Sequence, residues 1–342
     1  MNARELQPGT VKAHELLGDF WFNSEPVPVA ALRGRVLLLG FWDLSSEASL
    51  HALEYWEQWQ RKYEPAGLVS VAVHAPRFSF GRDPRVVDGA LRRLGVTLPV
   101  VTDNSGLILS RYQLRTPPSL ALVDRDGYVR LVVEGEGAFM QIERAIQGML
   151  LEANALQSLP DFAEPHRPGD RPGAMLIKGT AELFGGYLRG SVGNVEGAIP
   201  ESSLDFKDPG IHLQDRVYLE GEWLVGREAY EFGPTEGGKG SLIVSYSGLG
   251  ASAVLRSTQP GGTRVEVMQD DEHLREPERG EDLKRDSDGR TYLHVGEPKL
   301  YGVVKNREHG PHVLRLAFKG GRVEVFALSF AAGVVPESIP SN

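Results

Sequence analysis

The sequence predicts an α/β domain followed by an all-β sandwich. The first observation is an apolar run of β-forming residues at 36–42, which ends in a polar turn and leads into a helical pattern from Ser45 to Tyr63. The second is a change of period from Met175 onward, where short alternating runs are separated by glycine or charged turns. The third is length, because 342 residues are many for one core and favour two domains.

The first half of the chain alternates between strand and helix patterns. Residues 67–74 form a continuous apolar run, as expected of a parallel strand covered on both faces. Residues 19–29 are predicted to form a hairpin ahead of the first core strand. The predicted strands are 36–42, 67–74, 98–101, 119–123 and 128–133, and the predicted helices are 45–63, 83–94, 104–112 and 139–154.

The second half is predicted to be a β-sandwich, and a stretch rich in proline and glycine before it marks a linker. The charged segment 270–290 is interpreted as a long exposed loop. The predicted strands are 216–219, 222–225, 241–245, 251–255, 263–268, 291–295, 312–318 and 323–330. The expected domains are 1–157, a linker at 158–174, a jelly-roll-like sandwich at 175–336 and a tail at 337–342.

Composition and charge argue against several classes of protein. The net charge is −9 and no cluster of Lys and Arg offsets it, which argues against a nucleic-acid surface. No apolar run approaches the ~20 residues of a membrane span. Residues 1–18 lack the layout of a signal peptide, so a soluble, cytoplasmic protein is expected as written, or an extracytoplasmic one if a leader was removed.

The segment that begins at Phe41-Trp42 resembles the active-site segment of the TlpA/DipZ-like thiol–disulfide oxidoreductases, which have the thioredoxin fold. In that family Phe-Trp is followed, after a few residues, by Cys-x-x-Cys at the start of a helix. The two cysteine positions fall on Ser46 and Ser49 in this chain, with Glu47-Ala48 between them. The resemblance implies catalysis at those positions, with Glu47 and His74 as supporting residues.

A second motif completes this resemblance. Residues 115–118 read Arg-Thr-Pro-Pro before a predicted strand, and residues 124–127 read Asp-Arg-Asp-Gly after it. Thioredoxin folds carry a cis-proline before a central strand, facing the redox helix, so Pro118 is expected to be cis. The implied groove would take a protein disulfide or a peptide. Its residues would be Trp42, Thr116, Pro117 and Pro118.

The second half resembles the C-terminal jelly-roll module of DipZ-like proteins, which looks like a carbohydrate-binding module. The matching segments are 182–187, 223–226, 298–301 and 325–330. The resemblance implies a possible glycan ligand, for which Trp223, Tyr187 and Tyr246 are candidate stacking residues. Trp223 and Tyr301 are expected first of all to be core residues, because each lies in a strand-like run.

The missing sulfurs decide what the first motif can do. The chain has no cysteine, and a serine hydroxyl can neither ionise usefully nor form a disulfide intermediate. Ser45, Ser46 and Ser49 are therefore interpreted as helix-capping and surface serines. The thiols were lost naturally or were replaced by engineering, and the sequence leaves both open.

Other chemistries have weaker support in the sequence. A serine hydrolase is disfavoured, although His51 and His74 are near in sequence, because no Gly-x-Ser-x-Gly elbow is present. No metal and no cofactor is expected, since residues 286–289 lack the later glutamate of a calcium loop. Whether the chain is an enzyme stays open, and a non-catalytic peptide- or glycan-binding adaptor is the alternative.

Overall fold

Two buried parallel strands, β3 (Val36–Trp42) and β4 (Leu68–His74), lie at the centre of a seven-stranded sheet in the first part of the chain. The order of its strands is β1-β7-β6-β3-β4-β5-β2. The other strands are β1 (Asn2–Glu5), β2 (Trp21–Phe22), β5 (Val100–Thr102), β6 (Ser119–Val123) and β7 (Val129–Glu134). β5 continues the parallel pairing, whereas β6 and β7 run antiparallel.

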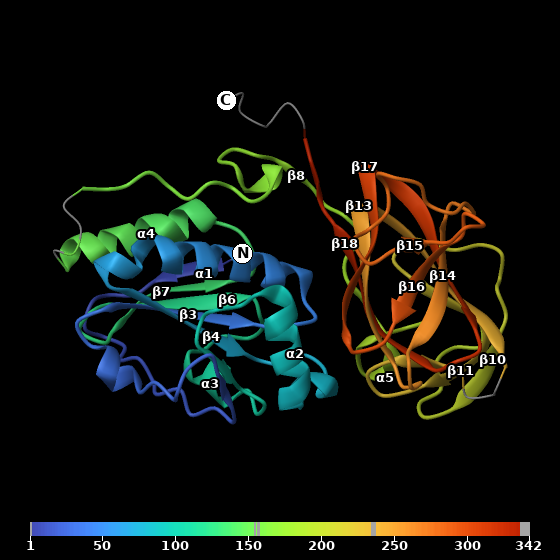
Figure 1. Cartoon of the computed structure of the whole chain (residues 1–342), viewed down its shortest axis with the longest axis horizontal. Coiled ribbons are helices and arrows are strands. Elements are labelled where there is room, and N and C mark those ends of the chain that lie inside the picture. The colour runs from blue at the N-terminus through green and yellow to red at the C-terminus, as the bar shows by residue number, and fades with distance from the viewer. Residues whose placement is uncertain (1, 154, 156–157, 234–236, 336–342) are drawn as a thin grey trace. The chain divides into compact units, whose positions relative to one another are not determined.

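The structure, a computed structural model, describes residues 2–153, 155, 158–233 and 237–335. The chain divides into two compact units, Met1–Pro172 and Gly173–Asn342. Figure 1 shows the first unit in blue to green and the second in yellow-green to red. The predicted tail at 337–342 lies outside the described residues.

Helices cover the sheet of the first unit. They are α1 (Glu47–Tyr63), α2 (Pro84–Leu94), α3 (Leu107–Arg111) and α4 (Phe139–Glu152), with the 3-10 turns η1 (Val29–Leu32), η2 (Glu64–Ala66), η3 (Ser79–Arg82) and η4 (Pro168–Asp170). α1 and α4 lie on the same side of the sheet (Figure 1). Gly40 allows α1 to approach closely, since a Cβ there would lie 2.3 Å from the Trp56 ring. This order of elements is the predicted one and is that of the thioredoxin fold.

The start of the chain differs from the prediction. The hairpin predicted at 19–29 is wrong, because β2 pairs with β5 and residues Val29–Leu32 form the turn η1 instead. The Glu15 carboxylate fixes that turn by accepting the backbone N–H groups of Val29, at 2.7 Å, and Ala30, at 3.1 Å. The sequence also gave no sign of β1, which adds an edge strand beside β7.

The second unit is built on one ten-stranded sheet. Its strands are β9 (Leu183–Phe184), β10 (Ser203–Phe206), β11 (Val217–Val225), β12 (Tyr230–Phe232), β13 (Lys239–Ser257), β14 (Thr263–Gln269), β15 (Lys284–Arg285), β16 (Thr291–Val295), β17 (Lys299–Lys319) and β18 (Val323–Ala331). A short pair, β8 (Leu176–Ile177) with β19 (Gly333–Val334), and the short helix α5 (Gly186–Arg189) complete it.

Two long strands make this sheet fold back on itself. β13 pairs with β17 along almost its whole length, with register shifts near Gly248 and Gly250. Because β13 also pairs with both β11 and β18, the strands β11, β12, β18 and β13 close a ring. The β-rich prediction is confirmed, but runs predicted as separate strands are continuous here. The particular jelly-roll topology is not confirmed.

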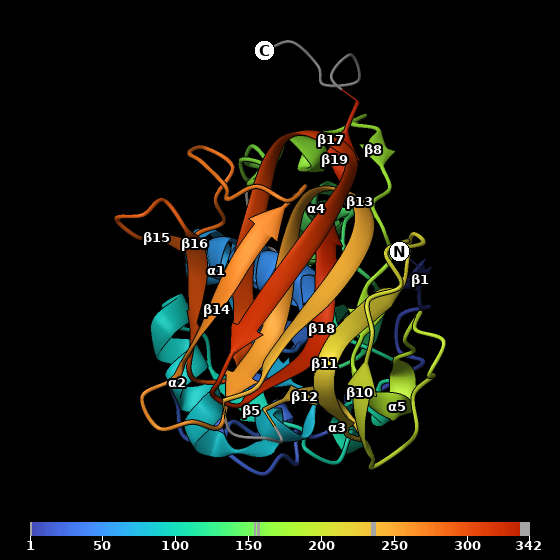
Figure 2. The same cartoon turned by 90° about the vertical axis from the view of Figure 1, so that its right-hand side faces the viewer.

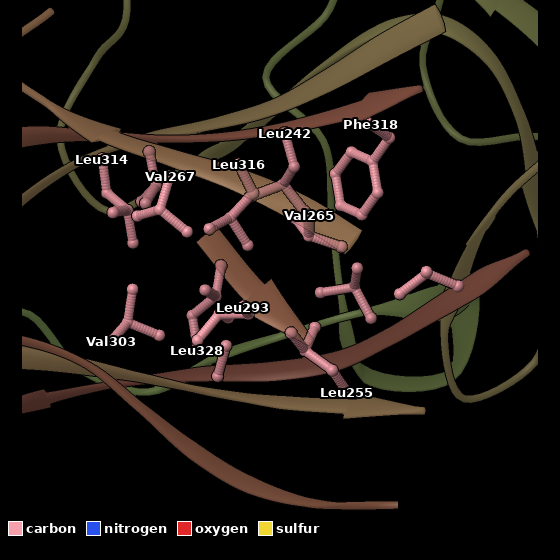
Figure 3. Packing of buried hydrophobic residues seen from close by; sticks show 14 of the residues in the cluster. Leu242, Leu255, Val265, Val267, Leu293, Val303, Leu314, Leu316, Phe318 and Leu328 are labelled. Carbon is pink, nitrogen blue, oxygen red and sulfur yellow. The ribbon is translucent and has the colours of Figure 1, made fainter. Parts of the chain in front are cut away.

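The core of the second unit fills the space inside this bent sheet. Figure 3 shows that β13 and β17 contribute to both sides of this core: Leu242, Leu316 and Phe318 lie on one side, and Leu255, Val303 and Leu328 lie on the other. Leu274 and Leu283 belong to the same core, each 4% exposed. The prediction of an exposed loop at 270–290 is therefore wrong in part, since two apolar side chains anchor that segment.

A buried histidine holds residues 158–172 against the helices of the first unit. His51 on α1 is 2% exposed and contacts Glu136 through Nδ1 and Asp170 through Nε2, at 3.0 Å from Oδ2. The Tyr55 hydroxyl donates to the same Asp170 oxygen at 2.8 Å. Burial lowers the pKa of His51, but its bonds to Asp170 and Glu136 outweigh burial and the nearby Arg167, so the pKa lies above its usual value.

This cluster predicts a pH-dependent stability. Because the pKa of His51 is raised on folding, protonated His51 stabilises the fold below the unfolded pKa, and that contribution is lost as the pH rises through the folded pKa. His51→Gln should lower the free energy of unfolding by about 2 kcal/mol at about pH 6, and by less at about pH 9. Urea unfolding at both pH values measures the difference. A difference that stays constant or grows with pH would contradict the assignment.

Candidate functional site

The candidate site lies at the carboxyl ends of β3 and β4. The parallel register places Trp42 beside His74, the last residues of the two strands. The loops that follow therefore leave the sheet at the same edge, and one of them leads directly onto the N-terminus of α1. Such an edge is where open α/β sheets commonly place chemistry.

Ser46 and Ser49 form the start of α1. Ser46 is the N-cap, and its Oγ accepts the backbone N–H of Ser49 at 3.3 Å. The capping interpretation is confirmed for Ser46. The surface interpretation is wrong for all three serines, since Ser45 and Ser49 are 0% exposed and Ser46 is 6% exposed. Among the residues that the structure describes, the Ser49 Oγ has no hydrogen-bond partner.

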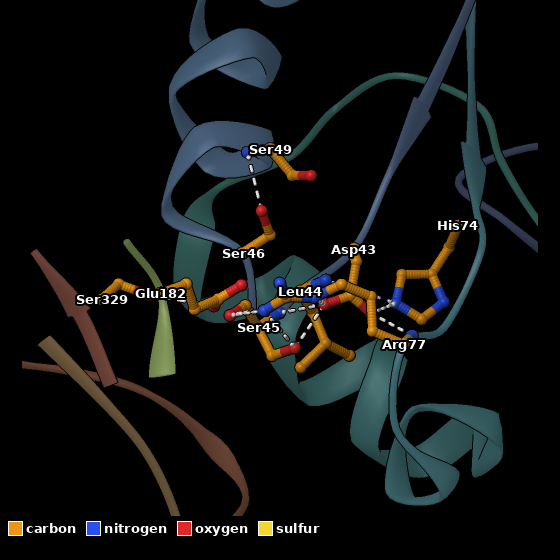
Figure 4. A network of polar contacts seen from close by, with 9 residues as sticks. All are labelled: Asp43, Leu44, Ser45, Ser46, Ser49, His74, Arg77, Glu182 and Ser329. Carbon is orange, nitrogen blue, oxygen red and sulfur yellow. Dashed lines mark hydrogen bonds and ion pairs between the residues drawn. The ribbon is translucent and has the colours of Figure 1, made fainter. Parts of the chain in front are cut away.

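A charged network fills the space beside the cap (Figure 4). Asp43 is 1% exposed and accepts Arg77 Nε at 3.2 Å and the Arg77 backbone N–H at 2.9 Å. Ser45 donates its backbone N–H to Asp43 at 2.9 Å and its hydroxyl to the same carboxylate. Arg77 Nη2 then donates to the Ser45 carbonyl at 2.7 Å. Asp43, Ser45 and Arg77, called the Asp43 network below, thus fix the loop that enters α1.

The electrostatics of the Asp43 network keep it charged. Burial alone would raise the pKa of Asp43, but Arg77, His74 and the Ser45 hydroxyl together hold that pKa below its usual value. Burial lowers the pKa of His74 to about 4, against the opposing effect of Asp43. His74 is therefore neutral near pH 7, and its Nε2 accepts the Leu44 backbone N–H at 3.4 Å.

The residues predicted to form a groove differ in exposure. Trp42 is 0% exposed, and its ring meets that of His74 edge-on at 5.1 Å. The Pro117–Pro118 peptide bond is cis, as predicted. Pro118 is buried, Pro117 is half-buried and Thr116 is exposed. Since Phe41 pairs with Ser119, these residues reach the same edge of the sheet as Trp42.

The other residue predicted to support the site, Glu47, contacts the segment 158–172. Its carboxylate lies 3.6 Å from Arg167, a residue of the segment that the His51 cluster holds. The structure thus brings His74 to Asp43 but turns Glu47 towards residues 158–172.

The aromatic residues considered for a glycan have mostly structural positions. Trp223 and Tyr246 are both 0% exposed in the core, and Trp223 donates its indole N–H to the Glu220 carbonyl at 2.9 Å. Tyr187 is half-buried against the same core. The core prediction for Trp223 and Tyr301 is confirmed. Neither Trp223 nor Tyr246 offers a ring face to a sugar.

Asp43 and Arg77 are the site residues that the sequence reasoning missed. The available signal was a lone aspartate directly after a buried strand, together with an arginine soon after the neighbouring strand.

Within the described part of the chain, no group of three or more His, Cys, Asp or Glu residues could hold a metal ion. No helix within that part is long and apolar enough to cross a membrane.

Comparison with known proteins finds proteins and a family profile that are similar to parts of this chain. A family profile described as "Thioredoxin like C-terminal domain" matches residues 180–331, within the β-rich unit. Protein DipZ of Mycobacterium tuberculosis is 28% identical over 254 residues, which cover 70% of this chain and 35% of that protein. Thiol-disulfide oxidoreductase YkuV of Bacillus subtilis is 24% identical over 139 residues, covering 40% of this chain and 93% of that protein.

The fold and the site define an α/β protein of the thioredoxin fold joined to a β-rich domain. The chain spans about a third of the length of the DipZ proteins that it matches. The chain is similar to the TlpA/DipZ-like redoxins in both units, and it contains no cysteine.

The Asp43 network predicts strong coupling between its two charges. Asp43→Asn should lower the free energy of unfolding by about 3 kcal/mol, because it leaves the Arg77 guanidinium without its carboxylate. Arg77→Met should lower the free energy of unfolding by a similar amount. The double variant should cost clearly less than the sum, since neither charge is then left alone. Urea unfolding of all four proteins tests this, and additive effects would refute the coupling.

Proposed function

We propose that this chain is a redox-inactive thioredoxin-fold protein that binds polypeptide without exchanging disulfides. The observation that carries the proposal is the use made of the two dithiol positions. Ser46 serves as the cap of α1, and Ser49 is buried in its first turn. The Ser46 hydroxyl therefore has a structural use, and the Ser49 hydroxyl is buried, at the place where relatives of this fold exchange thiols.

The local charges support a structural use of the helix start. A thiolate at a helix N-terminus is stabilised by free N–H groups and the positive helix end. Here the Ser46 Oγ accepts one of those N–H groups, from Ser49, and the Asp43 carboxylate accepts the Ser45 N–H in the turn that precedes the helix. With Arg77 bound to that carboxylate, the network already balances its own charges.

The polypeptide partner is inferred from the edge of the sheet and from the family. YkuV carries the name of a thiol-disulfide oxidoreductase, and we infer a protein partner for this chain by analogy. Thr116 is exposed and Pro117 is half-buried beside that edge, so they offer a surface that an extended peptide can reach. The burial of Trp223 and Tyr246 gives the glycan alternative no comparable support at those residues.

Restoring both thiols tests the redox half of the proposal. The protein as it stands should not accelerate reduction of insulin by dithiothreitol. The variant Ser46→Cys/Ser49→Cys should do so, because it places a dithiol at the start of α1. Ser46→Cys alone is the matched control and should stay near background, since it lacks a resolving thiol.

Two results would contradict this half. Catalysed reduction by the unaltered chain would show that the proposal of redox inactivity is wrong. A double variant that folds and forms its disulfide, yet stays inactive, would contradict the placement of the site.

A binding assay tests the polypeptide half. Reduced and carboxymethylated insulin B chain, labelled with a fluorophore, should bind with an affinity that Thr116→Arg lowers at least ~10-fold, because the longer side chain blocks the surface. Ser105→Arg introduces the same charge at another exposed loop position and should leave the affinity unchanged. Equal effects of the two substitutions, or no binding by the unaltered chain, would refute the peptide surface.

A further inference from the structure

The bent sheet of the second unit carries a polar trough on its outer face. The hollow has a volume of about 1060 Å³, similar to that of sites that hold small ligands. Residues of β10, β11, β13, β14 and β17 line it, with the turn at 286–290. Figure 2 views these strands side by side. The trough lies outside the core and contains none of the aromatic residues considered above.

The floor of the trough is a row of cross-strand neighbours. Glu220 on β11 pairs with Ser241 on β13, and Ser241 pairs with Ala317 on β17. Ala317 in turn pairs with Glu266 on β14. The small side chains of Ser241 and Ala317 thus lie between two glutamates. The Cα atoms of Glu220 and Glu266 are separated by three strand spacings, roughly 14 Å. This row leaves room for a flat ligand between two hydrogen-bond acceptors.

The two carboxylates of this row are held in place by partners outside it. Glu220 lies 3.4 Å from Arg315, and Glu266 lies 3.2 Å from His273. An ionised carboxylate has several acceptor positions, so each can still accept a ligand hydroxyl. The partners restrain the side chains without using up their capacity.

The next row along the strands is basic. Lys239 and Lys319 are direct cross-strand partners, an arrangement of like charges that destabilises a sheet. Among the described residues, neither ammonium group has a hydrogen bond or an ion pair. Arg264 lies on the adjoining strand, where Asp286 binds it and the Tyr292 ring lies 3.7 Å from its guanidinium carbon. An anion above the lysine pair would relieve the repulsion between the two charges.

The mixture of charges limits the class of ligand. The lining contains as many acidic as basic side chains: Asp205, Asp208, Glu220, Glu266 and Asp286 against Lys207, Lys239, Arg264, Arg290 and Lys319. A polyanion such as nucleic acid would meet those carboxylates, and a neutral apolar ligand would leave the charges unpaired. A ligand with an isolated carboxylate and many hydroxyl donors satisfies both rows.

We propose that this trough binds an acidic oligosaccharide, with a uronate carboxylate above Lys239 and Lys319 and sugar hydroxyls donating to Glu220 and Glu266. Ser241 and Ala317 provide the floor on which the sugar ring lies. The site is separate from the polypeptide surface of the first unit, so either assignment can fail without the other.

Calorimetric titration of the whole chain with tetragalacturonate tests the site. Binding is expected, and Lys239→Gln and Lys319→Gln should each weaken it at least ~10-fold. Ala317→Leu should abolish it by filling the floor while changing no charge. Lys305→Gln removes an exposed lysine elsewhere on β17 and is the matched control. Lys239→Gln should also raise the urea midpoint without ligand, because it removes one of two opposed like charges.

Three results would overturn the proposal. One is the absence of tetragalacturonate binding by a folded chain. Another is binding that the lysine variants and Lys305→Gln change equally. The third is equal or tighter binding of tetraglutamate, which would identify the trough as a peptide site.

Discussion

The first unit depends on a charge that has to be buried. Asp43 directly follows the central strand β3 and is almost fully enclosed, so its carboxylate would destabilise the fold if it stood alone. The parallel pairing of β3 with β4 allows this charge to be neutralised, because it brings Arg77 to the same edge of the sheet as Asp43. The resulting ion pair and the Ser45 hydrogen bonds determine how the chain enters α1.

The Asp43 charge also determines the surroundings of the two serines at the start of α1. The start of α1 is satisfied by the Ser46 cap and by contacts within the preceding loop. Beside it, His74 is neutral because burial lowers its pKa to about 4. The result is a charged but internally balanced edge of the sheet. We therefore propose that this chain acts through binding surfaces, one at the sheet edge of the first unit and one in the trough of the second.

The sequence was most informative where periodicity and local motifs determine structure. The order of helices and strands from 36 to 152 follows from apolar spacing, and local motifs predicted the capping of α1 by Ser46 and the cis peptide bond at Pro118. It was less informative where pairing between distant residues decides. Asp43 and Arg77 are far apart along the chain, so only the sheet register reveals that they meet.

Strand continuity in the second unit shows the same limit. The glycines near 248–250 read as a turn between two strands, but β13 runs through them as a bend, because β17 and β18 pair with it on both sides. The sequence did not predict the trough either, because its two rows consist of residues from different strands and no local pattern reveals the register between those strands.

The most direct test of the central claim is the titration of the Asp43 carboxyl group, followed by side-chain carbon NMR in the folded protein. The account predicts that Asp43 stays ionised at every pH at which the protein is folded and titrates, if at all, below its usual value of 3.8. Arg77→Met should shift that titration upward. A carboxyl that titrates above 3.8 in the unaltered protein, or one indifferent to Arg77, would contradict the claim that this pair organises the site.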